Sequence, residues 1–108
     1  MTDYLIIESR DSLECADTRF SFELATDLAR QGKRVCVFLV QNGVFPARSG
    51  ARSDLLDIAL DAGVRLLADD FSLRERGIGR DELNAGVSAS PLETVIDALA
   101  AGAKTLWH

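Results

Sequence analysis

The sequence predicts a small layered α/β domain, in which helices cover both faces of a mainly parallel sheet of four or five strands. Short apolar runs alternate along the chain with segments whose apolar residues recur at helical spacing. Residues 35–40 are apolar at every position, a pattern typical of a parallel strand that helices cover on both sides. The chain has 108 residues, the usual length of one domain, so we expect residues 1–108 to form a single unit.

The first half of the chain predicts two strands and two helices. An apolar run at residues 4–7 predicts the first strand, and an amphipathic helix follows over residues 18–30. The expected core stripe of this helix consists of Phe20, Leu24 and Leu28. After the strand at residues 35–40, Ser53 or Asp54 begins a second helix, which Gly63 ends.

The second half continues the alternation. Residues 64–68 predict a third strand and residues 104–108 a last one, whereas a brief strand at residues 86–88 has weaker support. Between them, Ser90-Pro91-Leu92-Glu93 combines an N-cap serine, a proline at the first helical position and a glutamate that closes a capping box. The helix that starts there bears Leu92, Val95, Ile96 and Leu99 and stops near Gly102.

Charge and composition argue against several classes of function. The net charge is -5 and no basic run is present, so neither nucleic acid nor a membrane is an expected partner. No apolar run reaches the roughly 18 residues that span a bilayer. The first residues do not resemble a signal peptide, so we expect a cytoplasmic protein whose cysteines are reduced. Without a phosphate-binding glycine motif or a Cys/His cluster, we expect no cofactor and no metal.

Three segments are expected to meet beyond the carboxyl ends of the strands, where ligands bind in open parallel sheets. They are residues 8–17, residues 41–46 and the pair Asp69-Asp70. The first two are long for connections in so small a fold, which is a modest indication of function. The residues that we expect to line a pocket or a partner surface there are Glu8, Arg10, Asp17, Asn42, Gly43, Asp69 and Asp70.

The two adjacent aspartates have more than one interpretation. Ser72-Leu73-Arg74-Glu75 matches a capping box, and if Ser72 is the cap, both aspartates lie outside the helix. If Asp70 is the cap, which we favour, it is structural and the role of Asp69 stays open. Alternatively, Asp69 and Asp70, with Glu8, could form an acid/base pair or hold a hard cation, which would make the protein an enzyme.

The remaining reactive side chains are two cysteines and one histidine. Cys36 lies inside an apolar strand and is expected to behave as a small buried hydrophobe. Cys15 lies at the entry to the first helix, where the helix dipole favours a reactive thiolate, although Glu14 and Asp17 oppose it. Cys15 is therefore the candidate catalytic residue. We expect His108 to be solvated.

The order of these motifs resembles the DsrE/DsrF/DsrH-like sulfur-relay family, which includes the TusBCD-type proteins and the YchN-like fold. The resemblance covers nearly the whole chain. The motifs that carry it are Ala16-Asp17 before a helix with Phe20, Val35-Cys36-Val37-Phe38-Leu39 followed by Asn42-Gly43-Val44, then Gly63-Val64, Arg76-Gly77-Ile78 and Thr105-Leu106-Trp107.

The resemblance implies a five-stranded sheet and assembly into trimers or hexamers, from copies of one chain or related subunits. In members that carry sulfur, a cysteine at the end of the third strand takes up sulfane sulfur as a persulfide and passes it to a partner protein. The matching position here is Asp69, which cannot accept sulfur. The first hypothesis is therefore a non-carrying oligomeric subunit or binding protein. The second is a variant carrier that uses Cys15, and the third is the carboxylate site described above.

Overall fold

The computed structural model describes all residues 1–108, and its centre is one sheet of five parallel strands in the order β4-β3-β2-β1-β5. The strands are β1 (Tyr4–Glu8), β2 (Val35–Leu39), β3 (Arg65–Asp69), β4 (Val87–Ser90) and β5 (Lys104–Trp107). The sheet confirms the expected α/β class, and the weakly supported fourth strand is present.

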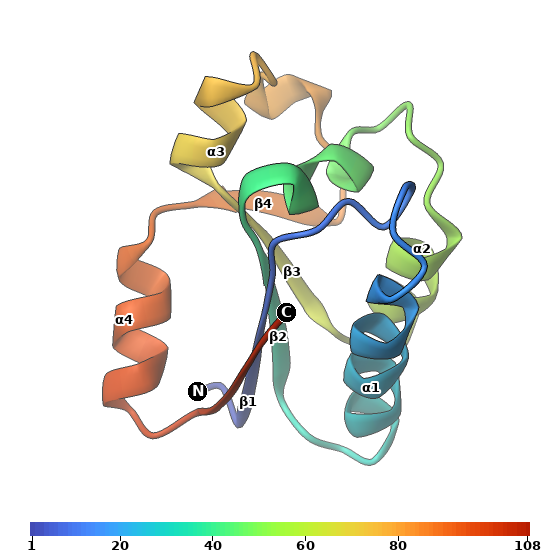
Figure 1. The fold of residues 1–108 in the computed structure, drawn as a ribbon. Coiled ribbons are helices and arrows are strands. Elements are labelled where there is room, and N and C mark those ends of the chain that lie inside the picture. The colour runs from blue at the N-terminus through green and yellow to red at the C-terminus, as the bar shows by residue number, and fades with distance from the viewer.

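Helices cover both faces of the sheet (Figure 1). The α-helices are α1 (Thr18–Arg30), α2 (Asp54–Asp61), α3 (Asp70–Glu75) and α4 (Glu93–Ala100), and two short 3₁₀ helices are η1 (Gln41–Ala47) and η2 (Arg80–Glu82). Helices α1 and α2 pack on one face, α4 packs on the other, and α3 lies with η1 above the carboxyl edge (Figure 1).

The two faces have cores of unequal size. Between the sheet and α1 and α2 lies a cluster of 16 buried hydrophobic residues, whereas the cluster on the α4 face has seven. On that smaller side only Val95 of α4 is buried, and Leu92, Ile96 and Leu99 are exposed. Leu92, Ile96 and Leu99 are not covered within this chain, because a helix of eight residues covers only part of the sheet.

The stripe that we expected on α1 is also shifted. Phe22 and Ala25 point into the core, Leu24 and Leu28 are half-buried, and Phe20 is 67% exposed. Phe20 and Phe22 are two positions apart on the helix, so their side chains point about 200° apart and cannot both face the sheet.

Helix α4 begins later than its capping signal suggested. Ser90 is the last residue of β4, and its hydroxyl bonds the Thr94 hydroxyl at 2.7 Å instead of capping the backbone. The helix starts at Glu93, with no side-chain cap. The strand pairing of Ser90 with Asp69 takes precedence over the local capping pattern.

Candidate functional site at the carboxyl edge of the sheet

The three segments predicted to meet at the carboxyl edge are joined there by hydrogen bonds. The Val40 N–H donates to the carbonyl of Glu8 at 2.9 Å, which fixes the end of β1 to the start of η1. The Gln41 N–H donates to the Ser72 hydroxyl at 2.8 Å, which fixes η1 to α3. The edge is thus one connected structure rather than three independent loops.

Asn42 and Gly43 keep η1 close against its neighbours. The Arg76 guanidinium donates from Nε to the Asn42 side-chain oxygen at 3.1 Å and lies against the Phe45 ring. Gly43 is buried, and a Cβ there would collide with the carbonyl oxygen of Glu8. Glycine is needed at this position for close backbone approach rather than for an unusual backbone angle.

Asp69 caps helix α3. Its backbone is still extended, with φ -62° and ψ 122°, because it is the last residue of β3. One carboxylate oxygen accepts both the Ser72 N–H at 3.0 Å and the Ser72 hydroxyl at 2.7 Å. Ser72 in turn accepts the Gln41 N–H, so the aspartate also supports η1.

Asp70 does not cap α3, contrary to the expectation. It is the first helical residue and pairs with Arg80 at 2.7 Å. The two aspartates thus have different partners. No group of three or more His, Cys, Asp or Glu side chains is arranged to hold a metal ion.

An apolar pocket of about 260 Å³ opens beside Asp69 on the α4 face of the sheet. Its lining comes from β1, β2, β3, α3, α4 and β5, and consists of Ile7, Phe38, Val40, Gln41, Asp69, Phe71, Ser72, Glu75, Leu92, Val95 and Trp107. Phe71, Leu92 and Trp107 are exposed at its rim. Of the predicted pocket residues, only Asp69 lines this pocket.

Glu8 lies on the opposite face from Asp69. Register pairs Glu8 with Leu39 and Leu39 with Ala68, and successive strand residues point to opposite faces. Glu8 therefore faces α1, as Ala68 does, whereas Asp69 faces α4. The hypothesis of a single carboxylate site that combines Glu8 with Asp69 is wrong for this reason.

The Glu8 carboxylate is fully buried and pairs with His108. Its two oxygens lie 2.9 and 3.0 Å from Nδ1 of the imidazole, and one of them also accepts the Arg10 N–H at 3.1 Å. We expected His108 to be solvated, but its side chain is only 27% exposed. Both residues lie at the ends of strands that the sequence predicts, so the sequence places them at the same edge of the sheet. It does not give the strand register that makes them neighbours.

The two cysteines lie in different surroundings. Cys36 is buried in β2, and burial raises the pKa of its thiol to about 11, although nearby Arg65 opposes this effect. Cys15 is half-buried in the loop before α1, and the Arg10 guanidinium lies 3.9 Å from its sulfur. Asp17 is exposed and makes no side-chain capping bond to α1.

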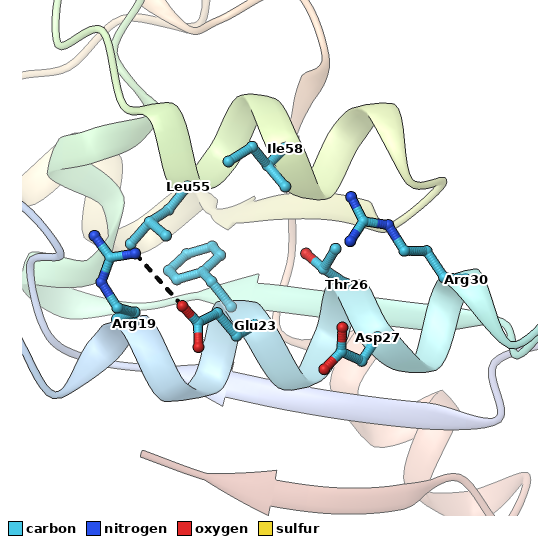
Figure 2. A pocket seen from close by; sticks show the side chains of 8 residues that line it. Arg19, Glu23, Thr26, Asp27, Arg30, Leu55 and Ile58 are labelled. Atoms are coloured by element: carbon cyan, nitrogen blue, oxygen red, sulfur yellow. Dashed lines mark hydrogen bonds and ion pairs between the residues drawn. The ribbon is translucent and has the colours of Figure 1, made fainter.

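A second groove, of about 420 Å³, runs between α1 and α2 (Figure 2). Figure 2 shows Arg19, Glu23, Asp27 and Arg30 along α1 facing Leu55 and Ile58 of α2, with Arg19 and Glu23 paired at 3.4 Å. None of the predicted site residues lines it. No helix is both long and apolar enough to cross a membrane.

These features define a small parallel α/β protein with polar and apolar sites on opposite faces of one sheet edge. The sequence profile of the DsrE/DsrF-like family matches residues 4–107, so the chain belongs to that family. No curated protein sequence matches it significantly.

Solved structures share the fold. YchN from E. coli superposes with a TM-score of 0.88 at 20% identity, over 100% of both chains. MTH1491 from Methanobacterium thermoautotrophicum, a protein of unknown function, superposes with a TM-score of 0.71 at 23% identity, over 98% of this chain and 100% of its own. BT1422 from Bacteroides thetaiotaomicron, a conserved protein of unknown function, superposes with a TM-score of 0.77 at 20% identity, over 98% of this chain and 95% of its own.

Proposed function

We propose that this chain is a DsrE-family subunit that assembles with further subunits and binds a partner protein, without carrying a persulfide at position 69. Asp69 occupies the position at which the resemblance implies a carrier cysteine. Its carboxylate cannot accept sulfane sulfur, and its hydrogen bonds to Ser72 give it a structural role. This observation carries the proposal.

Assembly is supported by an exposed apolar surface, which we call the α4 surface. It consists of Phe71, Leu92, Ile96, Leu99 and Trp107, whose exposures lie between 49% and 65%. Leu92, Ile96 and Leu99 are spaced to share one face of α4, and Leu92 meets Phe71 and Trp107 at the pocket beside Asp69. An apolar surface of this kind above the smaller of two cores suits a second subunit, as a trimer, a hexamer or a complex with sister chains.

The loss of carrier chemistry is tested by intact-mass spectrometry after incubation with a sulfane-sulfur donor. The wild type is expected to gain no sulfur, whereas Asp69→Cys is expected to gain one sulfur atom that reductant removes. A reductant-sensitive gain on the wild type would contradict the proposal. The absence of a gain on Asp69→Cys would show that the pocket differs from that of a carrier.

Assembly is tested by light scattering at micromolar concentration. We expect the wild type to be oligomeric and Ile96→Lys to be monomeric, because a lysine would place an unpaired charge in the contact. Ile58→Lys is a matched control, since Ile58 is 47% exposed but lies on α2. A monomeric wild type, or equal dissociation by the two variants, would refute the assignment of this surface.

A variant carrier that uses Cys15 is the second candidate. The guanidinium of Arg10 beside its sulfur is the observation that favours it, because a cation stabilises a thiolate. The mass experiment separates the two candidates, since a gain on the wild type that Cys15→Ser abolishes would establish this function instead.

A further inference from the structure

Glu8 and His108 have the arrangement of a base oriented by a carboxylate. Register pairs Ile7 with Trp107, so Glu8 and His108 are the next residues across β1 and β5, and both point to the α1 face. The chain there is held by the His108 N–H, which donates to the Ile7 carbonyl at 2.8 Å, and by the Ser9 N–H, which donates to the His108 carbonyl at 2.9 Å. The backbone of His108 is thus held on both sides, and its ring is held by Glu8.

The contacts of the pair decide which ring nitrogen is available. An ionised carboxylate only accepts hydrogen bonds, so Nδ1 of His108 carries a hydrogen and donates it to Glu8. The Arg10 N–H also donates to one oxygen of this carboxylate. Nε2 has no partner in the protein, and in the neutral ring it holds a lone pair.

His108 lines an open pocket of about 510 Å³ between β5 and the start of α1. The other lining residues are Ala16, Asp17, Arg19, Phe20 and Glu23. The pocket adjoins the carboxyl ends of β1 and β5. The strand order reverses between these two strands, because β2, β3 and β4 follow one another on one side of β1, whereas β5 lies on its other side. Open parallel sheets bind ligands at such a point.

We infer that this pocket binds a small, uncharged or cationic thiol and that Nε2 of His108 accepts the thiol proton. A thiol is a much stronger acid than an alcohol, so an imidazole can take its proton to form a thiolate–imidazolium pair. An alcohol is nearly as weak an acid as water and gives its proton to an imidazole only as its oxygen attacks another atom. An ion pair that forms before any further reaction is therefore open to a thiol and not to an alcohol.

The other lining residues restrict the ligand further. Phe20 is 67% exposed in the pocket, and sulfur packs favourably against an aromatic ring. Asp17 and Glu23 both line the pocket, and Arg19 is already paired with Glu23, so the unbalanced charge is negative. An anionic thiol is disfavoured by this charge.

In the transfer the S–H bond breaks, its electron pair stays on sulfur, and an N–H bond forms at Nε2. The imidazolium then lies between the new thiolate and the Glu8 carboxylate, so no oxidant, reductant or further reactant is required. The pocket lies on the α1 face, so this inference does not depend on assembly through the α4 surface.

The chain has a single histidine, so imidazole signals in nitrogen-detected NMR report on His108 alone. We would titrate the protein without oxygen with three probes: 2-mercaptoethanol, its oxygen counterpart ethylene glycol, and the anionic 3-mercaptopropionate. 2-Mercaptoethanol is expected to shift the Nε2 signal toward its protonated position in a saturable way. Ethylene glycol is expected to bind about tenfold more weakly or worse, because it cannot form the charge-assisted pair, and 3-mercaptopropionate is also expected to bind more weakly.

Three variants complete the experiment. Glu8→Gln is expected to reduce the shift strongly, because the neutral amide oxygen can still accept the Nδ1 hydrogen but does not stabilise the imidazolium by charge, while Asp61→Asn, which removes an exposed carboxylate on α2, is expected to leave it unchanged. Cys15→Ser is expected to keep the shift, which excludes exchange at that thiol as its source. If the Glu8→Gln variant does not fold, titration of the wild type with the three probes still tests the inference. No shift with 2-mercaptoethanol, or an equal shift with ethylene glycol, would overturn the inference.

Discussion

Replacing Asp69 by alanine is expected to lower the free energy of unfolding by about 2–3 kcal/mol. Loss of a helix N-cap costs about 1 kcal/mol, and loss of a charge-assisted bond to a buried hydroxyl costs about 1.5–3 kcal/mol. Both bonds end on one oxygen of Asp69, so the two costs overlap and do not add in full. The Ser72 hydroxyl also loses the acceptor that orients it toward the Gln41 N–H.

Urea unfolding followed by circular dichroism measures this change as a lower midpoint with an unchanged slope. Asp69→Ser is the matched control, because a serine hydroxyl can still accept the Ser72 N–H, and it is expected to cost about 1 kcal/mol. In heat, Asp69→Ala is expected to lower the Tm by about 10 °C or more, since 1 kcal/mol corresponds to about 4–8 °C in a domain of this size.

The result bears on function as well as on stability. If Asp69→Ala changes the free energy of unfolding by less than about 0.5 kcal/mol, the aspartate is not a structural replacement for a carrier cysteine, and the reasoning fails. If the cost is as large as expected, Asp69→Cys should be destabilised too, even where it gains sulfur. This chain would then have a stabilising aspartate at the position where a carrier has a reactive cysteine.

Two further predictions concern Gly43 and Cys36. Gly43→Ala is expected to cost about 2 kcal/mol or more in urea unfolding, because its Cβ meets the backbone carbonyl of Glu8 and neither segment can move aside easily; Gly50→Ala, in open space, is the control, and an equal effect of the two would contradict the close approach. For Cys36, the folded pKa of about 11 exceeds the unfolded value of about 9, so its stabilising contribution is complete below pH 9 and is lost as the pH rises toward 11. The stability of the wild type relative to Cys36→Val is therefore expected to fall by about 1.4 kcal/mol per pH unit in that window, and a difference that stays constant from pH 7 to 10 would refute this.

Local patterns predicted the elements and the edge at which the candidate site lies, because periodicity and turn residues are properties of short segments. They could not assign residues to the two faces of that edge. Glu8 and Asp69 both end strands, yet the register across β1, β2 and β3 separates them, and register depends on tertiary pairing. The sequence offered Ser72 or Asp70 as the cap of α3, whereas the cap is Asp69, because β3 runs to that residue and α3 starts directly after it.

Burial was harder to predict than secondary structure. Of the apolar residues Phe45, Pro46 and Trp107, Pro46 is buried and Phe45 is half-buried beneath Arg48 and Arg76. Only Trp107 is exposed. Sequence periodicity identifies an apolar side chain but not whether its own chain or another subunit covers it.

The position of β5 beside β1 has a consequence for synthesis of the chain. β1 is made first but pairs on one side with β2 and on the other with β5, and the bond between the Ser9 hydroxyl and the His108 carbonyl joins residues 99 positions apart. Until residues 104–107 have left the ribosome, one edge of β1 offers unpaired backbone groups along Leu5, Ile6 and Ile7, which other chains can pair with. The nascent chain therefore keeps one edge of β1 unpaired until residues 104–107 emerge, and pairing of β5 closes that edge.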